Sequence, residues 1–400
     1  MNIKKDFPIL NKNNIVFLDS TASTQKPSHV IDWIKDYLEN SYSNIHRWAY
    51  NIAEISEDLY NESKEKVSDF IWANSSREII YTYNSNYAVN IITQTLRFNK
   101  VLKKWDKVLL SIVEHHANIV PWLILKEELW IEIEYIWIDE NYDLDMNDFD
   151  KKYDDSVKII SLTQVSNVTG QIFELEKIWK QKREDTLFII DASQSIPHFN
   201  IDVQKLNCDF LFFTWHKLMA DTWIWILWWK QELLKKLRPI FSWWWAINKV
   251  EETCFKEASI PDKFEAGTPN ITGAVSLLKA LEYIESLWWY SKLENIENEL
   301  VEYSLKKFNK RKNIKLIWSN KSQNRVWVFS FIIEWVHSLD IADFLAWKNI
   351  CIRAWQHCAE PFLNTMWLKH TCRMSLYIYN TTDDINRFFE VLDEAILELK

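Results

Sequence analysis

The sequence predicts an α/β fold: a mainly parallel seven-stranded sheet between helices, followed by a smaller α+β domain. The first observation is that short β-rich runs alternate with helical stretches through most of the 400 residues, which is typical of parallel sheets covered by helices on both faces. The second is a change of character near residue 280, where long helices precede a few strands. The third is a composition ordinary for a globular protein, with 48% hydrophobic and 26% charged residues.

Seven runs rich in β-branched and aromatic residues are the expected strands of the large sheet. They are Glu78–Thr82, Lys107–Ile112, Ile131–Ile138, Val157–Thr163, Leu187–Asp191, Phe210–Thr214 and Ile224–Trp228. Helical segments such as Asn86–Leu96 and Trp122–Leu129 lie between several of them, and Pro27 suits the first turn of an earlier helix. Ligands of such sheets bind at the carboxyl ends of the strands, so the residues after each strand are candidates for chemistry.

The second domain is expected to begin near residue 286. Helical stretches over Ala274–Leu287 and Lys292–Phe308 lead to strands around Val326–Ile333, the helix "SLDIADFLAW", a strand-like "ICIRA" and a last helix from about Thr382. We therefore expect a large domain over residues 15–285. Residues 1–14 and 286–400 would form the smaller one.

Charge, hydropathy and cysteine usage exclude several classes of protein. The net charge of −9 argues against a nucleic-acid partner. No run reaches the roughly 18 apolar residues of a membrane span, and the start of the chain lacks a signal-like apolar core. The five cysteines include no CxxC pair, and their odd number favours a reducing compartment. We expect a cytoplasmic protein that binds neither nucleic acid nor membrane.

Polar side chains follow four of the seven expected strands. The segments are "VEHHANIVPW", "QVSNVTG", "DASQS" and "TWHKLMADT". Each residue has an ordinary explanation by itself: Lys217 as a solvated lysine, His115 as a surface or capping residue, Asp191 as a helix cap and Asn167 as a turn residue. Their joint occurrence at the ends of neighbouring strands indicates a ligand site.

With these segments, the chain resembles the fold-type I pyridoxal phosphate-dependent transferases, and among them the Suf-type cysteine desulfurases of the class-V aminotransferase family. The resemblance runs from "FLDSTASTQKPS" to "CRMSLYIYNT" and rests on "EHHANIVPW", "VSNVTG", "FEAGTPN" and the cysteine loop "RAWQHCAEPF". It implies pyridoxal 5'-phosphate as cofactor and L-cysteine as substrate. It also implies a homodimer and a sulfur-acceptor protein of iron–sulfur cluster assembly as partner.

The resemblance implies a role for each matching residue. Lys217 would form the Schiff base with the cofactor aldehyde, since a partly desolvated amine is a usable nucleophile. Asp191 would keep the pyridinium nitrogen protonated, and His115 would stack on the ring. The other cofactor contacts would be Gln194 and Asn167 at the phenolic oxygen, Thr214, His216 and the backbone N–H of Asn86 at the phosphate, and Thr268 at the phosphate of the neighbouring subunit.

Substrate contacts follow from the same resemblance. Arg373 would clamp the substrate carboxylate in a bidentate contact, with Arg353 and Asn167 beside it. Cys358 would accept the sulfur as a persulfide and leave L-alanine, its thiolate supported by Arg353 and His357.

The alternatives to a cysteine desulfurase are a selenocysteine lyase, another fold-type I enzyme such as an aminotransferase, and an inactive scaffold if the tryptophans described next are real.

Tryptophan stands where the family has glycine. The chain has 24 Trp and only 3 Gly, against an average glycine usage of roughly 7%. Glycine serves where φ is positive or the backbone is closely approached. We hypothesise that a UGA codon decoded as glycine has been written as tryptophan. The positions that stand out are Trp48, Trp215, Trp223, Trp225, Trp243–Trp245 and Trp355.

Overall fold

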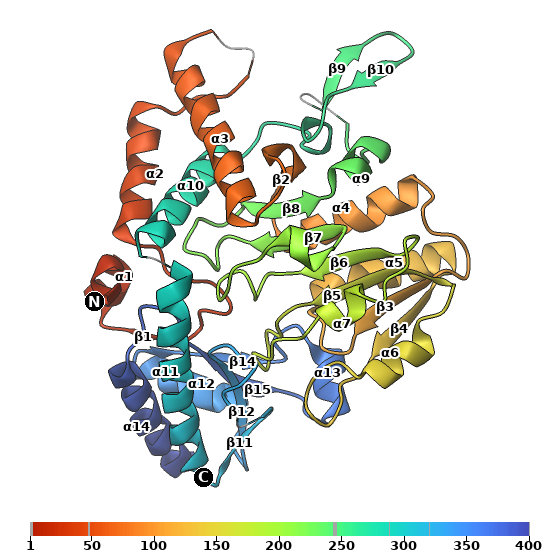
Figure 1. Ribbon diagram of the computed structural model, residues 1–400. Coiled ribbons are helices and arrows are strands. Elements are labelled where there is room, and N and C mark those ends of the chain that lie inside the picture. The colour runs from red at the N-terminus through yellow and green to blue at the C-terminus, as the bar shows by residue number, and fades with distance from the viewer. Residues whose placement is uncertain (1–2, 47–48, 243–245, 288, 320, 400) are drawn as a thin grey trace.

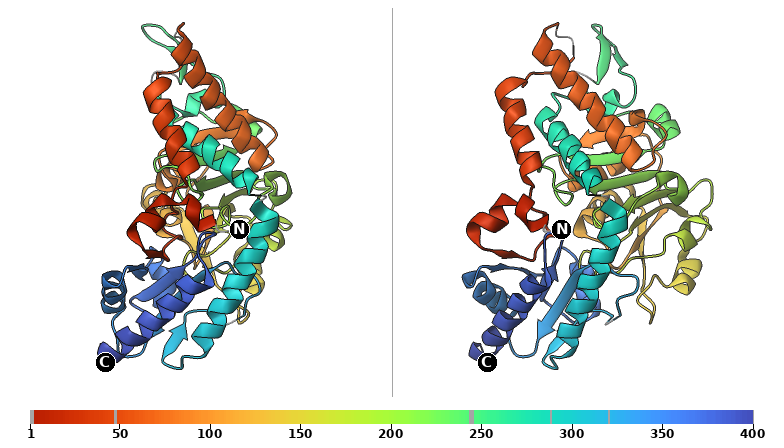
Figure 2. Two further views of the ribbon diagram at one scale, coloured as in Figure 1. Left: turned by 90° about the vertical axis from the view of Figure 1, so that its left-hand side faces the viewer. Right: turned by 60° about the vertical axis from the view of Figure 1, so that its left-hand side comes forward.

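The computed structural model describes residues 3–46, 49–242, 246–287, 289–319 and 321–399. Figure 1 shows two groups of elements: a large sheet with its helices, and a smaller sheet near the carboxyl terminus. Figure 2 shows helices α2 (Ser28–Asn40), α3 (Asn51–Phe70) and α10 (Ile271–Ser286) packed together at the end of the molecule opposite this smaller sheet. Within the described residues, no helix is both long and apolar enough to span a bilayer.

The large sheet has seven strands in the order β2-β8-β7-β6-β5-β3-β4, which confirms the predicted fold class. β8 runs antiparallel to both of its neighbours, and the other pairs are parallel. Three of the expected strands have the bounds predicted from the sequence, and the other four differ at their ends. The strands are β2 (Ile79–Thr82), β3 (Lys107–Ser111), β4 (Glu132–Ile136), β5 (Val157–Thr163), β6 (Leu187–Asp191), β7 (Phe210–Thr214) and β8 (Trp225–Trp229).

Both faces of this sheet are buried, as its nearly continuous apolar strands require. Along β7, Phe210 and Phe212 pack in one hydrophobic cluster, while Leu211 and Phe213 pack in another on the opposite face. The first cluster includes residues of α4 (Ser85–Phe98) and α5 (Val120–Leu129), and the second includes residues of α3 and α10. The remaining elements around the large sheet are α6 (Met146–Lys152), α7 (Glu176–Trp179), α8 (Val203–Leu206), α9 (Gln231–Lys236) and the hairpin β9 (Ile247–Val250) and β10 (Phe255–Glu257).

The smaller sheet is antiparallel, in the order β11-β12-β15-β14. Its strands are β11 (Ile314–Leu316), β12 (Val328–Ile333), β14 (Arg353–Trp355) and β15 (Thr371–Ser375). The surrounding helices are α11 (Trp289–Asn309), α12 (Ser338–Trp347), α13 (Glu360–Thr365) and α14 (Thr382–Glu398). The expected helix "SLDIADFLAW" is confirmed as α12, whereas β15 was not anticipated.

The amino-terminal segment joins this smaller sheet region. After α1 (Pro8–Asn13), the short strand β1 (Val16–Phe17) pairs in parallel with β13 (Ile350–Cys351). The "ICIRA" segment is therefore two strands, because β13 pairs with β1 while β14 pairs with β15. Residue 285, the expected end of the large domain, lies at the end of α10. The division into two domains stays a prediction.

Among the described residues, seven tryptophans have positive φ values, between 57° and 116°. All seven side chains are at least 49% exposed to solvent. A bulky residue in this backbone region is a genuine outlier. Of the positions singled out from the sequence, Trp223 and Trp355 belong to this group, Trp215 and Trp225 do not, and 48 and 243–245 lie outside the described residues. The group comprises Trp72, Trp105, Trp130, Trp223, Trp335, Trp355 and Trp367.

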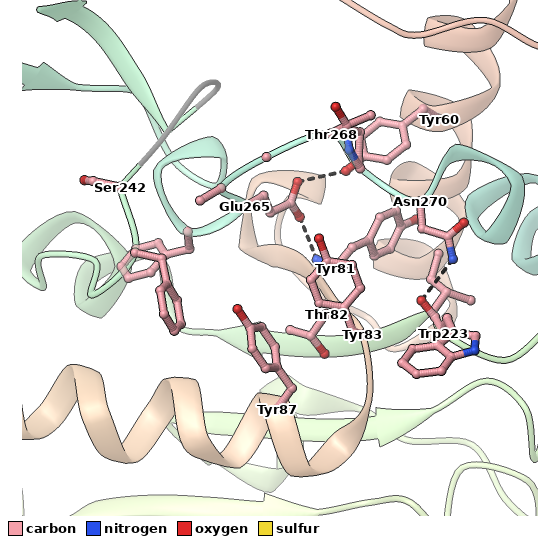
Figure 3. A pocket seen from close by; sticks show the side chains of 16 residues that line it. Tyr60, Tyr81, Thr82, Tyr83, Tyr87, Trp223, Ser242, Glu265, Thr268 and Asn270 are labelled. Carbon is pink, nitrogen blue, oxygen red and sulfur yellow. Dashed lines mark hydrogen bonds between the residues drawn. The ribbon is translucent and has the colours of Figure 1, made fainter.

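A buried ion pair fixes the loop that follows β10. Lys64 of α3 donates to both carboxylate oxygens of Glu265, at 2.9 and 2.8 Å, and both side chains are under 10% exposed. The Tyr60 hydroxyl and the Tyr81 backbone N–H complete the contacts of Glu265, at 2.8 and 2.6 Å (Figure 3). This carboxylate therefore links α3 and β2 to the 265–270 loop.

Lys64→Met should lower the free energy of unfolding by about 3–5 kcal/mol, because Glu265 would remain as a buried charge without its partner. Lys66→Met on the same helix is the matched control. Lys66 pairs with Glu285 at 2.8 Å, but the two side chains are 32% and 54% exposed, so its loss should cost less than about 1 kcal/mol. Urea denaturation at one protein concentration measures both, and equal losses would contradict the prediction.

Candidate active site

A cavity of about 360 Å³ lies at the carboxyl ends of the large sheet and reaches the smaller sheet. Side chains from the ends of β5 and β6 and from the loop after β7 meet there with side chains of β14 and β15. Nine of the residues expected at the site line it: Asn86, His115, Asn167, Asp191, Gln194, His216, Lys217, Arg353 and Arg373.

Lys217 follows β7, and its partly buried side chain lines this cavity. Burial lowers the pKa of its amine to about 8; the charges of Arg373 and Arg353 also lower it, whereas the carboxylate of Asp191 raises it. A charged amine loses hydration when it is buried, so burial shifts the equilibrium toward the neutral amine. Near neutral pH, part of the Lys217 population is therefore an unprotonated, nucleophilic amine.

Asp191 ends β6 and is 5% exposed. Burial raises the pKa of its carboxyl group, while hydrogen bonds from Ser193 and the charge of Lys217 lower it. The Ser193 N–H donates to Oδ1 at 2.8 Å. The structure thus places a carboxylate and an amine in one desolvated cavity, as the strand-end pattern predicted.

His115 lies in the cavity as a neutral imidazole. Burial lowers its pKa to about 3, and the charge of Lys217 lowers it further. The Ala117 N–H donates to Nδ1 at 3.1 Å, so we assign the ring proton to Nε2. The preceding residue, Glu114, is fully buried and accepts hydrogen bonds from Ser111, Asn118 and Thr163 at 2.5–2.8 Å.

Two arginines close the other side of the cavity. Arg353 of β14 lies opposite Arg373 of β15 in the register of the smaller sheet. Arg373 is 1% exposed; its Nη1 donates to the Asn167 carbonyl at 2.9 Å and its Nη2 to Asp19 Oδ1 at 3.0 Å. Its Nε is buried with no hydrogen-bond partner among the described residues. This arrangement leaves guanidinium donors for an anionic ligand.

The loop carrying Cys358 is docked against the segment carrying His115. The His116 N–H donates to the Cys358 carbonyl at 2.7 Å, and the Glu360 N–H donates to the His116 ring at 2.9 Å. Cys358 is partly exposed, and its φ is 56°. A non-glycine residue with positive φ is uncommon and is often found at functional sites.

One expectation for this loop is wrong: His357 does not supply a positive charge to the Cys358 thiol. The ring is buried, and burial, then Arg373 and Arg353, hold its pKa well below the ordinary value. His357 is therefore neutral at pH 7, with Nε2 2.8 Å from the Thr371 hydroxyl. Burial lowers the pKa of the Arg373 guanidinium, and the negative charge of Asp19 opposes this shift.

Three expected site residues do not line this cavity: Thr214, Cys358 and Thr268. Thr214 ends β7, and its buried Oγ1 has no hydrogen-bond partner among the described residues. Cys358 directly follows the lining residue His357. Thr268 lies in a different cavity of about 380 Å³, beside Glu265 and Asn270 (Figure 3).

The other residues expected to contact the cofactor are Asn86, Gln194 and His216. Asn86 is in the first turn of α4, whose N-cap Asn84 accepts a hydrogen bond from the Tyr87 N–H at 2.7 Å. Gln194 donates to the Thr21 carbonyl at 3.1 Å. The His216 ring is neutral, because burial lowers its pKa to about 3.

The segment 19–26 was not expected at the site, yet its residues Thr21 and Ala22 line the cavity. Asp19, from the same segment, reaches Arg373. The signal was present in "VFLDST", a short β-rich run followed by polar residues, which is the pattern that located the other strand ends.

The fold and the site define a class of protein. A buried lysine and aspartate lie at the carboxyl edge of a mainly parallel sheet, opposite two arginines of a second sheet. The family model for class-V aminotransferases matches residues 16–388. The chain belongs to the class-V aminotransferase family.

Within this class, the similar proteins are cysteine desulfurases. A probable cysteine desulfurase of a Synechocystis species is 32% identical over 98% of this chain and 95% of its own length. Among solved structures, the apo cysteine desulfurase of Thermococcus onnurineus is 30% identical with a TM-score of 0.94, covering 99% of this chain and 98% of the other. The cysteine desulfurase CsdA of Escherichia coli is 28% identical with a TM-score of 0.91, covering 100% and 98%.

Proposed function

We propose that this protein is a pyridoxal 5'-phosphate-dependent cysteine desulfurase. It converts L-cysteine to L-alanine, keeps the sulfur as a persulfide on Cys358, and passes it to an acceptor protein for iron–sulfur cluster assembly. The observation that carries this proposal is the convergence of Lys217, Asp191 and Arg373 in one cavity, with Cys358 in the adjoining loop. The names of the relatives support the same reaction.

The residues of the cavity fit this cofactor. A buried amine of lowered pKa at Lys217 suits an aldehyde, and the carboxylate of Asp191 suits a protonated ring nitrogen. Thr214 Oγ1 is buried and has no hydrogen-bond partner among the described residues, and such a polar atom normally has one. When bound, the cofactor supplies a protonated ring that withdraws electrons from the α-carbon of the amino acid.

The side chains of this chain carry out the remaining tasks. Arg373 binds the substrate carboxylate, and its burial excludes the water that would otherwise compete for it. Lys217 Nζ, with a pKa of about 8, both holds and releases a proton near neutral pH. The neutral ring of His115 presents its Nε2–H without adding positive charge beside Lys217.

Cys358 completes the reaction as the sulfur acceptor. Its Sγ attacks the sulfur of the substrate, the carbon–sulfur bond breaks, and the β-carbon takes up a proton. L-Cysteine and the Cys358 thiol thereby become L-alanine and the Cys358 persulfide, with no external oxidant or reductant. The partly exposed thiol and the neighbouring guanidinium groups of Arg353 and Arg373 suit this role.

A homodimer is part of the proposal. Thr268 lies in a second cavity rather than beside Lys217 of its own chain (Figure 3). This placement supports a contact of Thr268 with the cofactor phosphate of a neighbouring copy. A chain acting alone would leave that residue outside the site.

Cys358→Ala should abolish release of L-alanine from L-cysteine while the protein still binds its cofactor, because the substrate sulfur loses its acceptor. Cys254→Ala is the matched control, since Cys254 is exposed and bonds only to Glu251 in its own loop. Alanine release and visible absorbance of the bound cofactor are measured for both. Full turnover by Cys358→Ala would point to an aminotransferase, and a strong preference for selenocysteine in the wild type would point to a lyase.

Cofactor uptake by the apoprotein should depend on pH as the Lys217 amine does. Burial lowers the pKa of Lys217 from 10.5 to about 8. Below pH 8 the reactive unprotonated fraction falls about tenfold per pH unit, so the rate of uptake should rise up to pH 8 and then level off. Stopped-flow absorbance measures this rate. A rate that keeps rising to pH 10 would contradict the lowered pKa, and Lys217→Arg should show no such uptake.

A further inference from the structure

We infer that Asp19 is a positioning residue for the substrate carboxylate, acting through Arg373. The inference rests on the proposed function, in which Arg373 binds that carboxylate. Asp19 Oδ1 lies 3.0 Å from Arg373 Nη2, and the Asn167 carbonyl accepts from Nη1 at 2.9 Å. These two contacts fix the plane of the guanidinium group and leave Nε–H as a buried donor.

The backbone of Asp19 is held in place by contacts with two neighbouring segments. Asp19 forms a parallel bridge with Ser375 of β15, and the Thr21 N–H donates to the Ser375 hydroxyl at 3.0 Å. Further along the segment, the Thr24 N–H donates to the His216 carbonyl at 3.0 Å. The segment 19–24 therefore runs from the strand of Arg373 to the residue before Lys217.

Charge gives Asp19 a second effect on the site. Arg373, Arg353 and protonated Lys217 would otherwise place three positive charges around the cavity, and Asp191 is the one carboxylate among the residues that line it. Burial lowers the pKa of Arg373 and of Lys217, and the negative charge of Asp19 opposes this shift in both groups. Asp19 thereby keeps Arg373 charged and oriented before the substrate arrives, which reduces the ordering that binding requires.

The test is the substitution Asp19→Asn in the holoenzyme. We expect the KM for L-cysteine and the dissociation constant for the product L-alanine to rise roughly two- to tenfold, while kcat changes less. Calorimetric titration with L-alanine measures binding without turnover. Asp19→Glu, which keeps the charge, should recover part of the loss.

Ser20→Ala is the matched control in the same segment, because the Ser20 hydroxyl pairs with the Tyr379 hydroxyl at 2.8 Å and not with Arg373. It should leave KM unchanged. An unchanged KM in Asp19→Asn, or a loss of kcat alone, would overturn the inference. If Asp19→Asn fails to fold, Asp19→Ala is measured in its place, and an unchanged KM in that variant would overturn the inference equally. Failure of the proposed function is a different result, in which the wild type releases no alanine from L-cysteine.

A second inference rests on an independent observation, the backbone of the tryptophans. The geometry points to glycine as the residue incorporated at the seven tryptophan positions with positive φ. A left-handed conformation costs a residue with a β-carbon roughly 1–2 kcal/mol, and none of the seven side chains is buried in compensation. At Trp355, φ is 116°, beyond the left-handed helical region that other residues occasionally adopt.

Indole hydrogen bonds separate two further groups. Trp228 and Trp318 are buried, and their N–H groups donate to Glu78 and Gln171 at 3.0 and 2.9 Å. They behave as true tryptophans. Trp215 and Trp229 are equally buried, yet their Nε1 atoms have no hydrogen-bond partner among the described residues, which a native buried indole normally has. Positions 215 and 229 therefore join the glycine group.

Peptide mass spectrometry of the protein isolated from its native source tests this division. We expect glycine at positions 72, 105, 130, 215, 223, 229, 335, 355 and 367, and tryptophan at 228 and 318. Each such glycine lowers the peptide mass by the difference in mass between a tryptophan and a glycine residue. Tryptophan at most of the nine positions would overturn the inference, and so would glycine at 228 and 318.

Discussion

The burial of one amine and one carboxylate at the edge of the parallel sheet is the constraint around which the site is built. Lys217 and Asp191 lose hydration in the same cavity, and each moves the pKa of the other toward its charged form. Removal of either charge would leave the other uncompensated in a desolvated position, which proteins tolerate poorly. The adjacent parallel strands β6 and β7 bring the two groups together because their carboxyl ends meet at the same edge.

The smaller sheet contributes the arginines and the cysteine loop of the site. Its strands β14 and β15 contribute two arginines, and the loop between them carries Cys358. Contacts across the cavity hold the two parts in register: Arg373 bonds to the Asn167 carbonyl, Asn167 donates to the His357 carbonyl at 2.7 Å, and His116 bonds to the Cys358 carbonyl. Arg373 and the loop that carries Cys358 are thus tied to the strand ends of the large sheet by hydrogen bonds to backbone carbonyls.

Sequence patterns located the large sheet well, because strands buried on both faces are nearly continuous apolar runs. Strands β5, β6 and β7 have the predicted bounds. The strand β15 was not predicted from the sequence because "TCRMS" mixes polar and apolar residues. Its apparent polarity reflects Arg373, a charged residue that is buried only because Asp19 and Asn167 bind it. A buried charge of this kind has no periodic signature.

By itself, the sequence determined the strand–helix alternation and the strand-end residues His115, Asn167, Asp191 and Lys217, since both depend on local pattern. Only the tertiary structure decided that Asp19 meets Arg373, that His357 is neutral, and that Thr268 lies apart from Lys217. Those outcomes depend on burial and on contacts that the local pattern does not reveal, such as the one between Asp19 and Arg373, because the charge state of a side chain is set by its surroundings in space.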